Sequence, residues 1–129
     1  MSTRTQTLLS TLWIFIILNM FARDFHELGR PGMLEQVMAG VVDGVTITPG
    51  LMLLGGIMWE IFLVMVVLSQ VLKYRINRCV NMIVGLIAIA IIVMTNISPD
   101  LDNIFFMIIE IIALVAIIGI AWRWKIETA

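Results

Sequence analysis

The stretch PGLMLLGGIMWEIFLVMVVLSQVL, residues 49–72, decides how this sequence folds, because it is 24 residues long and contains one charged side chain, Glu60. At about 1.5 Å per residue, a helix of this length crosses the roughly 30 Å hydrocarbon core of a bilayer. Thr48 and Pro49 form a start signal, since threonine caps a helix and proline suits its first turn. The stretch therefore predicts a transmembrane helix that begins at Pro49.

Three more apolar runs of similar length follow the same pattern. Of the 129 residues, 61% are hydrophobic and 13% are charged, and the mean hydropathy is +1.08. Such a composition is far more apolar than that of a soluble domain. We predict an all-α membrane protein, a four-helix transmembrane bundle that forms one domain over residues 1–129. The predicted spans are residues 5–25, 49–72, 79–97 and 100–123.

The basic residues predict the orientation of these spans. Six of the eight lysines and arginines fall on one side of a four-span chain, and only Arg23 and Arg30 fall on the other. Cytoplasmic loops carry an excess of lysine and arginine. We therefore expect a multi-pass protein of the inner (plasma) membrane with both termini in the cytoplasm.

The first connection, residues 23–47, is long, and it is expected on the external side. A short amphipathic helix is predicted within it, because its apolar residues fall on one helical stripe. The stripe consists of Met33, Leu34, Val37, Met38, Val41 and Val42. Such a helix lies flat in the membrane interface or covers the ends of the bundle, and the sequence leaves both alternatives open.

Several functions are excluded by residue counts. The formal net charge is −1, and no basic face is present, so nucleic-acid binding is not expected. Cys79 is the single cysteine and His26 the single histidine, so one chain forms no internal disulfide and no multi-histidine metal or haem site. We predict no catalytic residues and no metal ligands, and the cofactor is unknown.

Two glutamates are the strongest candidates for a buried site. Glu60 and Glu110 each lie about ten residues into a predicted span, or roughly 15 Å below its outer end. An ionised side chain at such a depth costs about 2.5 to 3.5 kcal/mol, so each should face the interior and find a partner, or be protonated. We expect both to face one interior space as a ligand site. The alternative is that each only holds helices together.

Other polar residues have spacings that bring them to the same end. Asn19, Arg23 and His26 fall at i, i+4 and i+7 on the first span. Arg23 is a counter-charge for the buried acids, or it pairs with Glu27 at the membrane surface. Asn96, at the outer end of the third span, would line a cavity that opens outward. The predicted ligand-binding residues are Glu60, Glu110, Asn19, Arg23 and Asn96.

Several short segments of the sequence carry a family resemblance: Leu9–Phe15, Trp59–Ile61, Leu68–Ser69, Leu72–Arg75 with Asn77–Arg78, and Ile104–Phe106 leading to Glu110–Ile111. They resemble an uncharacterised family of bacterial four-span integral membrane proteins, and the resemblance covers most of the chain. The resemblance implies a four-helix bundle in a bacterial inner membrane and no assigned activity. In size and topology the family is loosely similar to DoxX-like proteins, which is an analogy at the level of fold.

These features favour a non-enzymatic bundle that binds a small amphipathic or cationic ligand of the lipid or quinone type. Glu60 and Glu110 would hold its polar end, and residues 31–42 would cover it. Two alternatives remain. One is a proton- or cation-coupled transporter or channel that acts as a homo-oligomer, and the other is an accessory subunit of a membrane complex. The expected partners are membrane lipids and the lipophilic ligand.

Overall fold

The four predicted spans are present as four long helices. The computed structural model describes residues 3–95 and 101–125, and the helices in this part that could cross a membrane are α1 (Thr3–Glu27), α3 (Pro49–Val71), α4 (Tyr74–Thr95) and α5 (Leu101–Arg123). Their 22 to 25 residues correspond to about 33 to 38 Å. A bilayer needs roughly 30 Å. The predicted all-α, four-span fold is confirmed.

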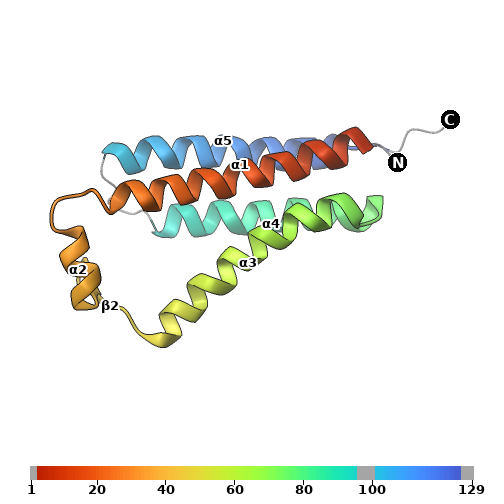
Figure 1. Cartoon of the computed structure of the whole chain (residues 1–129). Coiled ribbons are helices and arrows are strands. Elements are labelled where there is room, and N and C mark those ends of the chain that lie inside the picture. The colour runs from red at the N-terminus through yellow and green to blue at the C-terminus, as the bar shows by residue number, and fades with distance from the viewer. Residues whose placement is uncertain (1–2, 96–100, 126–129) are drawn as a thin grey trace.

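The helices form an antiparallel bundle with two distinct ends. α1 begins and α5 ends at one end, which we call the terminal end, and the opposite end, which carries α2 (Met33–Ala39), is the loop end (Figure 1). α1 packs against α3 and α5, and α4 packs against α5, whereas the N-terminal half of α3 diverges from the other helices (Figure 1). The buried residues of α3 accordingly all lie in its C-terminal half: Phe62, Met65 and Ser69.

The core follows one apolar stripe of α1. Leu9, Trp13 and Ile16 are fully buried, and the Trp13 ring stacks on Phe62 of α3 with centroids 5.8 Å apart. Leu114 and Ile117 of α5 complete this core. Most other apolar side chains are exposed, as expected of helices whose outer faces meet lipid.

One face of α4 packs closely on α5. Asn81, Gly85, Ala88 and Ile92 form a stripe of mostly small and polar residues along α4, and all four are buried. A Cβ atom added to Gly85 would lie 2.8 Å from Cγ1 of Ile118. This stripe is therefore a packing face, since small residues let helix backbones approach closely in membranes.

A buried amide network joins α1, α3 and α4 near the terminal end. Trp13 Nε1 donates to Asn81 Oδ1 at 2.8 Å, and Ser69 Oγ donates to the same oxygen at 3.3 Å. Asn81 Nδ2 donates to Asn77 Oδ1 at 2.6 Å, while Asn77 Nδ2 donates to the backbone oxygen of Ser69 at 2.8 Å. The four side chains satisfy one another, so this network serves the packing of three helices.

This network also explains why the third span begins earlier than predicted. α4 starts at Tyr74, five residues before Cys79, and the connection to α3 is only Leu72–Lys73. Asn77 lies in the first turn of α4, and its side chain caps carbonyls at the end of α3, at Ser69 and Leu72. The predicted end of this span at residue 97 lies outside the described residues.

The first connection contains the predicted short helix and a hairpin that was not predicted. α2 covers Met33–Ala39, so the expected helix is confirmed over its first part. Val41–Val42 does not continue the helical stripe, because these residues form β1, which pairs antiparallel with β2 (Val45–Thr46). Asp43 and Gly44 between them have φ angles of 50° and 81°, as a type I′ turn requires.

Candidate functional site

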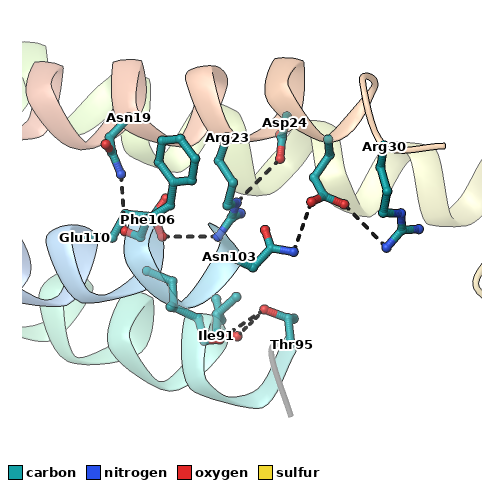
Figure 2. Close-up of polar contacts among 11 residues, drawn as sticks. Asn19, Arg23, Asp24, Arg30, Ile91, Thr95, Asn103, Phe106 and Glu110 are labelled. Carbon is teal, nitrogen blue, oxygen red and sulfur yellow. Dashed lines mark hydrogen bonds and ion pairs between the residues drawn. The ribbon is translucent and has the colours of Figure 1, made fainter. Parts of the chain in front are cut away.

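A seam of polar side chains runs between α1 and α5 at the loop end, and it is drawn in Figure 2. Asn19, Arg23 and Glu27 are four residues apart on α1, so they share one face. Asn19 Nδ2 donates to the backbone oxygen of Phe106 at 3.3 Å, and Asn103 Nδ2 donates to Glu27 Oε1 at 3.0 Å. This polar seam therefore leads from the loop end into the bundle.

The innermost contact of the polar seam is an ion pair. Arg23 NH1 lies 3.1 Å from Glu110 Oε2, and the Glu110 side chain is fully buried while that of Arg23 is 15% exposed. Glu110 Oε1 has no hydrogen-bond partner among the described residues. The buried acid thus depends on Arg23 for its neutralisation, because a carboxylate in a low-dielectric interior is stable only when paired or protonated.

Arg23 also contacts a second carboxylate. Its Nε lies 3.7 Å from Oδ1 of Asp24, whose side chain is 56% exposed. One guanidinium therefore faces two acids, Glu110 on the inner side and Asp24 on the outer side (Figure 2). When both acids are ionised, Arg23 and the two acids together carry a net charge of about −1. The excess negative charge lies on the side of Asp24.

Asp24 opens into a groove between α1 and the diverging half of α3. The groove has a volume of about 790 Å³ and, besides Asp24, is lined by apolar residues of α1, of the turn that follows it, and of α2 and α3: Phe21, Phe25, Leu28, Val37, Met52 and Trp59. We call it the Asp24 groove. Sites for small molecules are typically of this size and have mostly apolar walls with few polar groups.

Two glycines belong to the same face of α3. Gly55 and Gly56 lie three and four residues after Met52, and Trp59 follows at the next turn. A Cβ atom at either glycine would meet nothing within 4 Å. Contacts among the described residues therefore do not require these glycines, which lie between Met52 and Trp59 of the groove wall.

Glu60 does not share an interior space with Glu110, so that prediction is wrong for the single chain. Glu60 is exposed, and it has no hydrogen bond or ion pair within residues 3–95 and 101–125. It stands two residues, or about 200° around the helix, from buried Phe62. The divergence of α3 and this angle turn the carboxylate away from the core. Its ligand-binding role stays a prediction.

The other predicted site residues have different outcomes. Asn19 and Arg23 lie together with Glu110, as expected from the i, i+4 spacing. His26 lies in the outer part of the same region, with Nε2 3.4 Å from Asp102 Oδ2. Asn96 lies outside the described residues.

Sequence reasoning missed Asp24 and gave Arg23 an alternative partner that it does not have. Glu27, one turn after Arg23, pairs instead with Arg30 at 3.6 Å and with Asn103. The signal for Asp24 was present, because it falls on one helical face with Phe21, Phe25 and Leu28. All four residues line the Asp24 groove.

The described part of the chain contains no group of three or more histidine, cysteine, aspartate or glutamate side chains that could hold a metal ion. The polar seam and the Asp24 groove together offer a cation-attracting carboxylate in apolar surroundings. Such an arrangement can bind and orient a ligand.

Comparison with known proteins adds a family and no activity. Neither a curated protein nor a solved structure matches this chain. The likeness to DoxX-like proteins and a bacterial origin therefore stay predictions. A protein family does match residues 1–129, in agreement with the resemblance to an uncharacterised four-span family. The chain therefore belongs to the family of unknown function DUF6326.

Proposed function

We propose that this protein binds an amphipathic, lipophilic cation in the Asp24 groove. The observation that carries the proposal is a single half-exposed carboxylate in a groove whose other lining residues are all apolar. The apolar walls favour an apolar body, and Asp24 favours a positive group at one end. The ligand class is the one expected from the sequence. The carboxylate that would hold its positive end is Asp24 and not Glu60.

The neighbouring ion pair leaves a negative net charge beside the Asp24 groove. Arg23 lies between Glu110 and Asp24, and its charge offsets only one of the two. A cation near Asp24 would complete the balance in surroundings where charges are poorly screened. Trp59 and the two phenylalanines add aromatic faces, which attract cations. An anionic ligand of the same shape would meet repulsion from the excess negative charge.

A proton relay across the bundle has less support. It would need polar contacts from end to end, but Ile16 of α1 and Leu114 of α5 are buried between the polar seam and the amide network. Both are apolar and fully buried. The groove, by contrast, opens on one side of the bundle and suits binding better than conduction.

We further propose that the protein lies in the inner membrane with both termini cytoplasmic, because six of its eight basic residues belong to the terminal end. Met38 in α2 is 81% exposed at the loop end, and Ile76 is 54% exposed at the terminal end. With Cys79→Ser as background, an impermeant maleimide added to intact cells should label Met38→Cys and spare Ile76→Cys until the cells are lysed. The reverse pattern contradicts this orientation.

The function is tested with two ions of matched shape. Tetraphenylphosphonium is a lipophilic cation, and tetraphenylborate is an anion of nearly the same size. In equilibrium dialysis of the purified protein in detergent, we expect the cation to bind saturably at one site and the anion only as it partitions into empty micelles. Asp24→Asn should weaken cation binding about fivefold, the value of a partly exposed ion pair.

Two further variants make the test specific. Asp102→Asn removes an acid at the same end that does not line the groove, and it should leave cation binding unchanged. Gly55→Leu should fill space beside the groove, abolish binding and leave the fold intact, because nothing lies within 4 Å of the new Cβ. If both ions bind alike, or Asp24→Asn and Asp102→Asn behave alike, the proposal is wrong.

A further inference from the structure

A second groove lies at the opposite end of the bundle, between the start of α1 and the end of α5. It has a volume of about 620 Å³, and its lining includes apolar residues of α5, such as Ala116 and Ile120, and the sequence Arg123–Lys125. None of the described residues that line it is acidic. We call it the terminal groove, and it shares no residue with the Asp24 groove.

Trp124, which lines the terminal groove, has a buried hydrogen-bond donor without an acceptor. Trp124 is 4% exposed, and its Nε1 has no hydrogen-bond partner within the described residues. The residue is held in place by Tyr74, whose hydroxyl donates to the backbone oxygen of Trp124 and whose ring packs edge-on against the indole at 5.2 Å. An indole N–H is only a donor, and buried donors are normally paired, so this position calls for an acceptor.

The surrounding charges indicate that the acceptor is an anion. Arg123 and Lys125, on either side of Trp124, are exposed and line the groove. The end of a helix carries a partial negative charge that would oppose an anion. Here Arg78 neutralises it, since its Nε and NH2 donate to the oxygens of Ala121 and Trp122, each at 2.9 Å.

We propose that the terminal groove binds the phosphate group of an anionic phospholipid. A phosphate oxygen would accept from Trp124 Nε1 and pair with Arg123 and Lys125, while an acyl chain would lie along the apolar residues of α5. The position suits a lipid, because α5 ends where a membrane-spanning helix reaches the headgroups and is followed by tryptophan. Basic pockets between transmembrane helices characteristically hold anionic headgroups.

The test compares lipids that differ only in headgroup. Purified protein is titrated with phosphatidylglycerol or phosphatidylcholine of the same acyl chains, and bound lipid is counted by native mass spectrometry. We expect one phosphatidylglycerol to bind roughly thirtyfold more tightly than phosphatidylcholine, as about 1 kcal/mol for each of two basic residues implies. Arg123→Gln with Lys125→Gln should abolish this preference, and Trp124→Phe should reduce it several-fold.

The matched control is Lys73→Gln with Arg75→Gln, which removes two charges from the same end without touching the terminal groove. This control should keep the preference. If it loses as much as the Arg123 and Lys125 double variant, the attraction is diffuse and the site does not exist. Equal binding of both lipids also overturns the proposal. Complete displacement of phosphatidylglycerol by inorganic phosphate at the same concentration shows that the acyl chains contribute nothing to binding, which contradicts a lipid site.

Discussion

Replacing Arg23 by leucine is expected to lower the free energy of unfolding of the bundle by about 3 kcal/mol. The Glu110 side chain is fully buried, and its contact with Arg23 at 3.1 Å is the ion pair that neutralises it within the described residues. Without the guanidinium, the acid must either remain charged in an apolar interior or take up a proton, and both are costly. Reversible unfolding in mixed micelles titrated with sodium dodecyl sulfate measures the change.

Two variants separate this effect from a general loss of charge. Arg30→Leu removes a cation from more exposed ion pairs with Glu27 and Asp43, so it should cost less than about 1 kcal/mol. The double variant Arg23→Leu with Glu110→Leu removes both buried charges and should recover most of the lost stability. If Arg23→Leu costs no more than Arg30→Leu, Glu110 does not depend on Arg23.

Replacing Gly85 by leucine is expected to lower the free energy of unfolding by at least about 3 kcal/mol, and alanine should already cost about 1 kcal/mol. An added Cβ would lie 2.8 Å from Cγ1 and 3.3 Å from Cδ1 of Ile118, so even alanine requires that side chain to move. Leucine requires α4 and α5 to separate. The same unfolding titration measures both variants.

Gly56→Leu is the matched control, because nothing lies within 4 Å of a Cβ at that position. This substitution should be neutral or slightly stabilising, since leucine favours a helix by nearly 1 kcal/mol over glycine. Similar losses at positions 85 and 56 would show that α4 and α5 are not packed as closely as described.

Much of the fold was predictable because membrane spans depend on length and composition. The cap at Thr48 is as expected, with Oγ1 accepting from Leu51 N at 3.1 Å. The packing face of α4 was also predictable, since small and polar residues stand out against an otherwise apolar helix. Asn77 and Asn81 are four residues apart on α4, but the amide network was not predicted, because its partners Trp13 and Ser69 come from other helices.

The direction of Glu60 could not be predicted in the same way. α3 is apolar on every side, so its periodicity does not distinguish a face toward the core from a face toward lipid. Depth in the membrane follows from counting residues, but direction depends on how the helix packs. The buried positions Phe62, Met65 and Ser69 place Glu60 on the opposite side.

The candidate site, too, could be predicted only in part from the sequence. The polar face of Asn19 and Arg23 followed from spacing, but the choice of Glu110 over Glu27 depends on contact between α1 and α5. The Asp24 groove exists because α3 diverges from α1, and this divergence has no local signature in the sequence. Tertiary packing therefore determines that Asp24 is exposed whereas Glu110 is buried.

Photoaffinity labelling with a lipophilic quaternary ammonium that carries a benzophenone tests the location of the proposed site most directly. Mass spectrometry of the labelled protein should place the adducts on residues 21–28 of α1 and 52–59 of α3, the two walls of the Asp24 groove. Excess tetraphenylphosphonium should suppress these adducts, and Gly55→Leu should lack them. Adducts spread evenly over the lipid-facing residues of α4 and α5, with no competition, would contradict the account.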